Sequence, residues 1–263
     1  MMKQLIYLIS IAVILAFSGC VKDNSDSGSG GVIIAKDSST VNLDFDFVYG
    51  EQDFNLNQVY DYSFGYELKF DKLNLYVSHI SLVKNDGTVI EGSEIVFVNA
   101  DTSAHNWVSF RIPVGDYSKI RFSIGVPPNL NGTDNPDFDA ALYNADHPLS
   151  LNNGLYWTWN AGYRFILIDG RVNSNPMADN EFETLLSIHT GKDYSFRETE
   201  IAQQFKVEKE DTIGLDLRFD VSLFLENPDD VIDLLIDNQS HGENAPLANR
   251  VSDNAIKSAQ VIQ

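Results

Sequence analysis

Residues 154–165, which read GLYWTWNAGYRF, carry the most information about the architecture of this chain. Two of the three tryptophans, Trp157 and Trp159, lie in this segment, and glycines bracket it. Side chains alternate along an extended strand, so we expect Trp157 and Trp159 to share one face. Indole rings are large and stiff, and their N–H groups need a partner when buried. Two interpretations follow: the tryptophans fill a β-core, or they line a site where indole chemistry matters.

Alternation of apolar and polar residues predicts strands over most of the chain. The clearest examples are 41–47, 73–78, 109–113, 119–124, 164–168 and 213–221. Residues 81–84 and 88–90 flank an Asp86-Gly87 pair, which predicts a hairpin with a tight primed turn. Two segments, 228–236 and 245–257, are typical of helices because each follows an Asx or Pro start signal. The pattern predicts an all-β fold, an antiparallel β-sandwich with long loops and one or two short C-terminal helices.

Two long polar loops, 127–153 and 170–180, interrupt the predicted strands. Loops longer than about 12–15 residues are usually functional or disordered. The first loop holds several Asp and Asn residues, whose oxygens suit a hard cation such as Ca²⁺, although their spacing matches no EF-hand loop. A plain solvated loop and a Ca²⁺ site are both compatible with this segment.

The N-terminal residues predict an export signal followed by a lipid anchor. The apolar run 5–17 is too short to span a bilayer and suits the core of a signal peptide. Small residues precede Cys20, the only cysteine in 263 residues, as in a lipoprotein cleavage box, and lipidation explains the lone thiol. We therefore expect a signal peptide over 1–19, a lipidated Cys20 with a flexible tether over 20–31, and one β-sandwich domain over 32–263.

This organisation predicts an exported protein, lipid-anchored in a bacterial cell envelope at the outer membrane. Periplasmic and surface-facing orientations both stay open. The formal net charge of −20 argues against nucleic acid as a partner. The sequence has no nucleophile elbow, no His-Glu-x-x-His, no phosphate-binding glycine loop and no paired-cysteine metal site. We therefore expect a binding protein and not an enzyme.

Several other segments accompany the tryptophan segment in a fixed order. They are 75–82 (LYVSHISL), 122–127 (FSIGVP), 148–149 (PL), 188–191 (IHTG) and 240–241 (SH). Together with 154–165 they resemble the MbnP-like family, which includes copper-binding surface proteins of methanotrophs and many Bacteroidetes lipoproteins. The resemblance spans essentially the whole predicted domain, and the tryptophan strand followed by His-x-Gly is its most specific part.

The resemblance implies a β-sandwich that binds copper. In characterised members a tryptophan is oxidised to kynurenine by a partner dihaem enzyme of the MauG-like class, and histidines complete the site. Imidazole is a good ligand for copper in either oxidation state. In this sequence His189 matches the family histidine, while Trp157 and Trp159 match the paired tryptophans.

The chain departs from the family pattern after the Gly-Val-Pro segment. Copper-binding members tend to have Asn-His there, whereas this chain has Asn131 and Gly132. His147, later in the same loop, is the substitute that the sequence offers, and His241 is a further candidate metal ligand. Two interpretations stay open: the copper site is retained, or the fold is retained without the metal.

Two rival functions use the same aromatic strand in other ways. A cell-surface glycan-binding lipoprotein would stack sugars on exposed indoles, and a structural or adhesive module would use the strand only for packing. The exposure of the rings distinguishes these interpretations. Tryptophans buried beside His189 favour the metal site, whereas a flat exposed platform favours sugar binding.

Overall fold

The computed structural model describes residues 37–263, except 102, 103, 105, 134, 159, 179, 180 and 243. The predicted signal peptide, Cys20 and the tether lie outside the described residues, as does Trp159. The division of the chain into these segments and one domain stays a prediction. Within the described part, no helix is long and apolar enough to cross a membrane.

Strands dominate the described residues, which confirms the predicted all-β class. The strands are β1 (Ser38–Tyr49), β2 (Gln52–Asp53), β3 (Val59–Tyr62), β4 (Tyr66–Lys84), β5 (Val89–Asn99), β6 (Trp107–Pro113), β7 (Gly115–Ile124), β8 (Tyr156–Thr158), β9 (Gly162–Asn173), β10 (Thr184–Gly191), β11 (Arg197–Val207), β12 (Thr212–Asp220), β13 (Asp230–Val231), β14 (Gln239–Ser240) and β15 (Ala259–Ile262). The helices are α1 (Pro128–Asn131), α2 (Ser222–Glu226) and α3 (Ala245–Ser258), with 3₁₀ turns η1 (Ser63–Gly65), η2 (Ala140–Leu142), η3 (Leu151–Asn153) and η4 (Asp193–Ser195).

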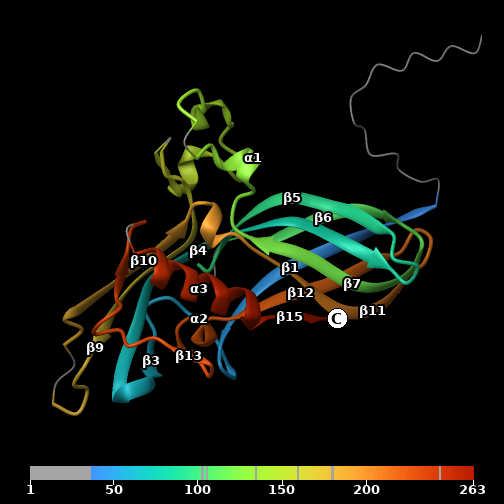
Figure 1. Ribbon diagram of the computed structural model, residues 1–263. Coiled ribbons are helices and arrows are strands. Elements are labelled where there is room, and N and C mark those ends of the chain that lie inside the picture. The colour runs from blue at the N-terminus through green and yellow to red at the C-terminus, as the bar shows by residue number, and fades with distance from the viewer. Residues whose placement is uncertain are drawn as a thin grey trace, which may run out of the picture. The chain divides into compact units, whose positions relative to one another are not determined.

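Two sheets form the sandwich (Figure 1). The smaller sheet has the order β15-β12-β1-β2, and β6 also pairs with β1. The larger sheet has the order β11-β7-β4-β9-β10-β14. In addition, β3 and β5 pair with β4, and β8 pairs with β9. Most pairs are antiparallel, as predicted, but β1–β12 and β10–β14 are parallel. Parallel neighbours need a long crossover connection, so periodicity along the chain gives no sign of them.

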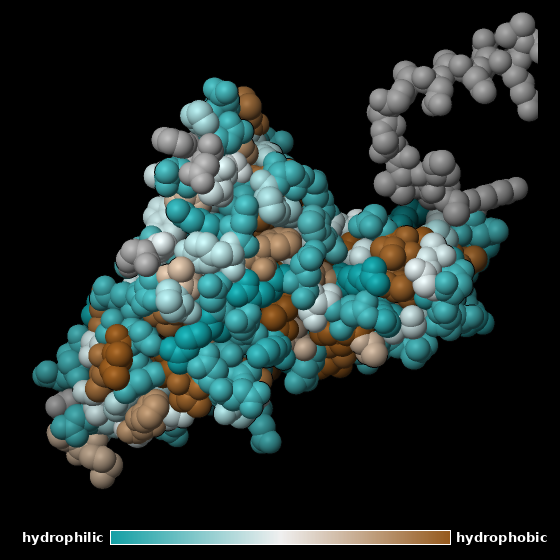
Figure 2. All heavy atoms as spheres, in the orientation of Figure 1, coloured by the Kyte–Doolittle hydropathy of each residue, from teal (hydrophilic) through white to brown (hydrophobic). Residues whose placement is uncertain are grey.

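The core lies between the sheets and follows from alternation along β1. Val41, Leu43, Phe45 and Phe47 are buried, while the residues between them point away from the core. Phe219 of β12 is fully buried, with its ring centroid 5.8 Å from that of Phe47. On the face drawn in Figure 2, hydrophilic residues cover most of the surface and apolar patches are scattered among them.

The long strand β4 connects two regions of the larger sheet. Its first half pairs with β3 and β9, and its second half pairs with β5 and β7. Register shifts interrupt the ladder near Ser78 and Ser81, and His79 between them has a φ of 50°. His is among the residues that tolerate this left-handed conformation, which suits the extra residue of a bulge.

The β4–β5 connection is a hairpin, as predicted, but the predicted primed turn is wrong. Gly87 N–H donates to Lys84 O at 2.9 Å, and Gly87 has a φ of 87°. Asp86 is not among the residues with positive φ, whereas a type I′ turn needs positive φ at both central positions. The glycine alone takes the left-handed position, as in a longer loop with a glycine bulge.

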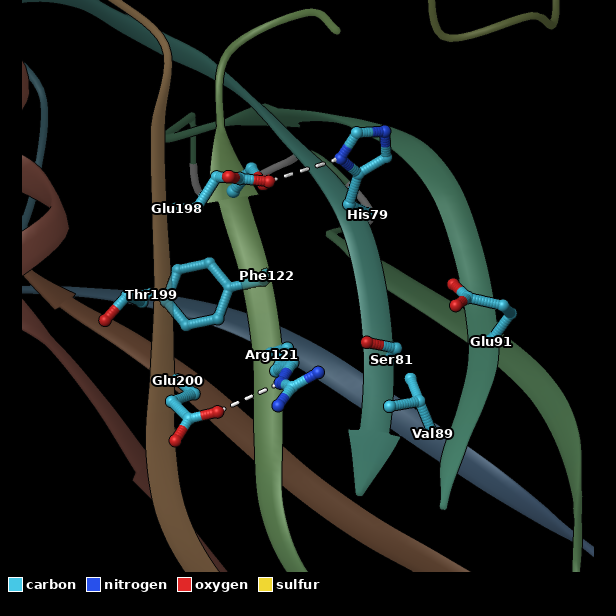
Figure 3. Close-up of a pocket in the computed structure, with 10 residues that line it drawn as sticks. His79, Ser81, Val89, Glu91, Arg121, Phe122, Glu198, Thr199 and Glu200 are labelled. Atoms are coloured by element: carbon cyan, nitrogen blue, oxygen red, sulfur yellow. Dashed lines mark hydrogen bonds and ion pairs between the residues drawn. The ribbon is translucent and has the colours of Figure 1, made fainter. Parts of the chain in front are cut away.

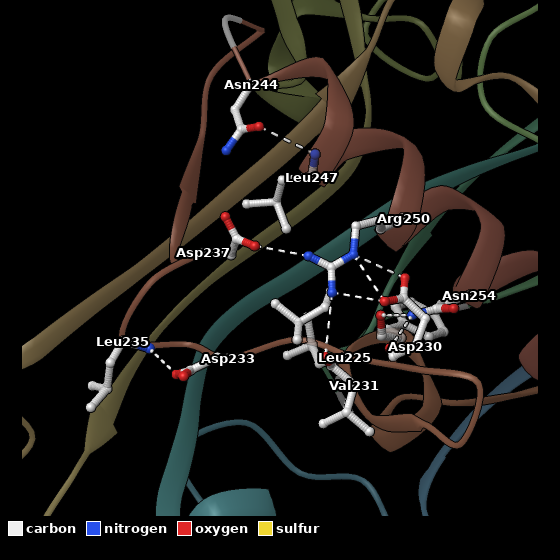
Figure 4. Close-up of polar contacts among 12 residues, drawn as sticks. Leu225, Asp230, Val231, Asp233, Leu235, Asp237, Asn244, Leu247, Arg250 and Asn254 are labelled. Carbon is white, nitrogen blue, oxygen red and sulfur yellow. Dashed lines mark hydrogen bonds and ion pairs between the residues drawn. The ribbon is translucent and has the colours of Figure 1, made fainter.

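The predicted helix 245–257 is confirmed as α3, and the predicted helix 228–236 is wrong. The Asn244 side chain caps α3 by accepting from Leu247 N–H at 3.2 Å. Arg250 of α3 contacts this other segment and the residue after it. Its guanidinium lies 2.7 Å from the carboxylate of Asp230 and 2.8 Å from that of Asp237 (Figure 4). These contacts and the short antiparallel bridges of 226–227 with 230–231 draw the backbone out of a helical path.

The long segment 127–153 folds over a second, smaller cluster of buried residues. Tyr163 O–H donates to Leu149 O at 2.8 Å, and Tyr76 O–H donates to Pro148 O at 3.1 Å. Asn131 Oδ1 accepts from Tyr163 N–H at 2.8 Å. The segment is therefore fixed to β4 and β9. The second predicted loop starts later than expected, because β9 continues to Asn173.

Candidate functional site

Two histidines far apart in the sequence meet at the end of β10. His189 lies on β10, and β14 pairs with β10 in parallel through Ser187–Gln239 and Ile188–Ser240. This pairing brings His241, the residue after β14, beside His189. Their ring centroids are 4.8 Å apart, with the planes at 77°. His189 is buried, with 8% exposed, whereas His241 is exposed, so the pair is open to solvent on one side.

Trp157 completes an aromatic group of three rings with these histidines. Its ring centroid lies 6.0 Å from that of His189 and 6.4 Å from that of His241, edge to face in both cases. The strand β8, which holds Trp157, pairs with β9, and β9 pairs with β10. Strand pairing therefore places Trp157 close to His189, and both were predicted from the sequence as candidate site residues.

A cation covers the indole of Trp157. The guanidinium carbon of Arg164 lies 4.7 Å from the ring centroid, and Nη1 of Arg164 donates to Gly154 O at 2.9 Å. Burial lowers the pKa of the Arg164 guanidinium, and the nearby Asp169 carboxylate opposes that shift. An arginine stays charged in either case, and a cation over an indole face is attracted by the ring quadrupole. Trp157 is half-buried, so it does not form an open aromatic platform.

Asp169 and Ser187 lie against the two imidazoles and connect them. Ser187 Oγ donates to Asp169 Oδ1 at 2.9 Å, and His189 Nε2 lies 2.8 Å from the same carboxylate oxygen. His241 Nε2 lies 3.0 Å from Ser187 Oγ. Burial raises the pKa of the Asp169 carboxyl, but the hydrogen bonds from His189 and Ser187 outweigh it, so the pKa is held below its ordinary value.

Two nitrogens of this group are buried and have no hydrogen-bond partner among the described residues, namely Nδ1 of His189 and Nε of Arg164, and only the histidine nitrogen can act as an acceptor. Buried polar atoms are nearly always satisfied, so an orphan acceptor indicates a missing ligand or water. In the described ranges no set of three His, Cys, Asp or Glu side chains is arranged to hold a metal ion. The two imidazoles are thus not joined by a third ligand of these types among the described residues.

Other predicted site residues lie elsewhere or outside the described part. His147 stacks on Tyr143 with ring centroids 4.3 Å apart, and its Nδ1 accepts from Leu149 N–H at 3.0 Å. The structure thus brings His241, and not His147, to His189. Gly132 has a φ of 67°, and a Cβ built there would overlap the ring of Phe138. A side chain at this position would therefore displace the Phe138 ring.

Asp169, Ser187 and Arg164 were not predicted as site residues. Ser187 and His189 are two apart on a strand, which places them on one face. Asp169 is a lone carboxylate that ends the apolar run 165–168. These two signals could have identified both residues, whereas their contact with His241 depends on strand pairing.

A surface cavity of about 840 Å³ lies over β4, β5, β7 and β11 and includes His79 (Figure 3). Arg121 there is paired with Glu200 at 2.9 Å, and His79 Nδ1 lies 3.8 Å from Glu198. None of its lining side chains is among the buried groups without a partner. The group around His189 is therefore the better candidate site.

Comparison with known families and structures gives one family and one structure. A family model described as MbnP matches residues 38–243, which is most of the chain. A solved structure, MbnP from Methylosinus trichosporium, is similar over 72% of this chain and 78% of that chain, with 15% sequence identity and a TM-score of 0.46. Comparison with curated protein sequences gives no match.

Proposed function

The chain belongs to the MbnP family, and we propose that it is an exported, lipid-anchored protein that binds copper between His189 and His241, beside Trp157. The observation that carries this proposal is the convergence of the two imidazoles, with one buried nitrogen that has no partner among the described residues. Imidazole nitrogen is a preferred donor for copper. A lipid on Cys20 would leave no free thiol to compete for the metal.

The third donor is supplied by Trp157 after oxidation to kynurenine by a partner dihaem enzyme of the MauG-like class. In this step dioxygen is the oxidant and the C2–C3 bond of the indole is cleaved, and hydrolysis then releases C2 as formate. In the described residues no third His, Cys, Asp or Glu joins the two imidazoles, so a further donor would be of another kind. Kynurenine presents an aromatic amine and a ketone, which are donors that indole lacks. The contacts of Trp157 with both histidines support this ring as the one that is modified.

A glycan-binding role is less well supported. Sugar stacking needs an open aromatic face, and the guanidinium of Arg164 covers the indole of Trp157. The calcium alternative for the loop 127–153 has no donor group of three acidic or histidine side chains in the described part of that loop. We therefore assign the binding function to the His189–His241 pair.

The test is Cu(I) binding measured by competition with a colorimetric chelator, on protein isolated from the native host. The variants keep Cys20, because the lipid proposed there leaves no free thiol to take the metal. We expect one equivalent of Cu(I) for the reference protein and loss of tight binding in His189→Ala and His241→Ala, since each removes a ligand.

His147→Ala is the matched control. It also removes a histidine, but the contacts of His147 are with its near neighbours Tyr143 and Leu149. It should bind Cu(I) like the reference protein. Circular dichroism checks that each variant is folded. Unchanged binding in both His189→Ala and His241→Ala would overturn the site, and loss of binding in His147→Ala alone would reassign it.

A further inference from the structure

The hydrogen bonds around His189 define where the protons lie. Ser187 Oγ donates its proton to Asp169 Oδ1 at 2.9 Å, so toward His241 Nε2, at 3.0 Å, the same oxygen is an acceptor. Asp169 is a carboxylate and can only accept, so His189 Nε2, at 2.8 Å, must carry the proton. Both imidazoles are therefore held with a proton on Nε2, and a neutral His189 has its lone pair on Nδ1.

This assignment agrees with the burial of His189. Nδ1 is the nitrogen that is buried and has no hydrogen-bond partner among the described residues. A ring held through Nε2 thus offers Nδ1 as its free donor atom. Metal-bound histidines commonly donate their other N–H to a carboxylate, which fixes the tautomer and the ring orientation.

The sheet places these side chains on one face by register. Ser187 of β10 is directly opposite Asp169 of β9, and His189 follows Ser187 by two residues on the same face. Ile188, between them, is fully buried on the opposite face. The other charged groups near Asp169 are Arg164 and Lys72, and both attract the carboxylate without replacing its bonds to Ser187 and His189.

We propose that Asp169 and Ser187 are positioning residues of the two-histidine site: Asp169 fixes His189 so that Nδ1 faces the metal, and Ser187 ties His241 to the same carboxylate. This inference rests on the proposed copper site and adds the residues that decide which nitrogen of His189 binds. Removal of such an outer partner typically lowers metal affinity about 10–100-fold.

The first test is nitrogen-15 NMR of the metal-free and Cu(I)-loaded protein. Cu(I) is diamagnetic, so the ring nitrogens can be observed in both states. In the metal-free protein we expect His189 with a protonated Nε2, whose proton is protected by Asp169 and loses that protection in Asp169→Ala. On loading with Cu(I), Nδ1 of His189 should shift while Nε2 keeps its proton.

The second test is the Cu(I) affinity of matched variants. Asp169→Ala and Ser187→Ala should bind about 10–100-fold more weakly, and Ser187→Thr, which keeps the hydroxyl, should restore the affinity. Asp71→Asn is the control, since Asp71 is a carboxylate of the same sheet that pairs with Arg171 at 3.8 Å. It should bind like the reference protein.

The outcomes separate this inference from the proposed function. Coordination of His189 through Nε2, or reference-level affinity in both Asp169→Ala and Ser187→Ala, would overturn the positioning role while leaving copper binding intact. Absence of Cu(I) binding in the reference protein would overturn the proposed function. The metal-free spectrum still decides the positioning role in that case, because a His189 protonated on Nδ1 contradicts it.

Discussion

Trp157 contacts groups of two kinds, namely the imidazoles of His189 and His241 and the guanidinium of Arg164. Trp107 provides the contrast, because it is 53% exposed and has no recorded contact with a histidine ring in the described residues. An enzyme that modifies one specific tryptophan would oxidise Trp157 because of its surroundings. Adventitious chemical oxidation would instead favour the more exposed ring, that of Trp107. The two tryptophans therefore distinguish these causes within one molecule.

We expect protein from the native host to carry kynurenine at Trp157 and an unmodified Trp107. The measurement is tandem mass spectrometry of tryptic peptides, in which Trp107 falls in a different peptide from Trp157, and fragment ions separate Trp157 from Trp159. Stronger oxidation of Trp107 would indicate chemical damage. Native protein with no modified tryptophan would contradict the proposed third donor.

Gly132 is a residue whose identity is dictated by its backbone. It ends α1 in the left-handed conformation, and a Cβ there would overlap the Phe138 ring. The absence of a histidine at this position is therefore built into the local packing. The histidine that lies beside His189 is His241, with ring centroids 4.8 Å apart.

At the scale of elements, the tryptophan segment is shorter as a strand than its sequence predicts. The strand β8 ends at Thr158, because Ala161 N–H turns back to Thr158 O at 3.1 Å. Alternation therefore does not continue to Asn160. Trp159 lies outside the described residues, so the predicted shared face of Trp157 and Trp159 stays a prediction.

The contacts of α3 with the segment before it are the reason that 228–236 is not a helix. Arg250 forms a two-pronged contact with Asp230, with Nε at 3.0 Å and Nη2 at 2.7 Å, and a further bond with Asp237 (Figure 4). Each element thereby stabilises the other. A helical preference of a few tenths of a kcal/mol per residue is too weak to compete with several such bonds.

We expect Arg250→Met to lower the free energy of unfolding by about 1–3 kcal/mol, because two carboxylates lose charge-assisted hydrogen bonds. Arg250→Lys should recover only part of this, since an ammonium cannot reproduce the planar fork. Urea unfolding followed by circular dichroism measures both. Lys257→Met, at an exposed position of the same helix, is the control and should change stability by less than about 1 kcal/mol. Equal effects in Arg250→Met and the control would show that the network does not stabilise the fold.

At the scale of the whole described unit, the two sheets are joined by aromatic contacts through Phe219. This ring of β12 lies 5.8 Å from Phe47 of β1 and 6.3 Å from Phe122 of β7, which belongs to the other sheet. Phe219 is fully buried. Its removal would leave a cavity that faces both sheets.

We expect Phe219→Ala to cost about 3–5 kcal/mol of stability, from lost burial and the cavity together. Ile236→Ala, at a side chain that is 77% exposed, is the control and should stay within about 0.5 kcal/mol of the reference. Denaturant titration at equilibrium gives both values. A cost below about 1 kcal/mol for Phe219→Ala would mean that the core closes around the loss, and that the sheets do not depend on this ring.

The sequence by itself determined the β class, most of the strands and the helix α3. It also predicted Trp157, Trp159, His147, His189 and His241 as candidate site residues, without showing which of them meet. Alternation and capping are local signals, because they report which face of an element is buried and where it begins. The order of short motifs around the tryptophan strand likewise depends only on the chain, and it predicted the family that residues 38–243 match.

The tertiary structure alone decided which of these residues meet. The parallel pairing of β10 with β14 brings His241, and not His147, to His189, and the register of β9 against β10 adds Asp169 and Ser187. Contacts between distant residues also explain why 228–236 is not a helix, because Arg250 pairs with Asp230 and Asp237. Strand partners are chosen by the fit of residues far apart in the chain, so no local pattern contains them.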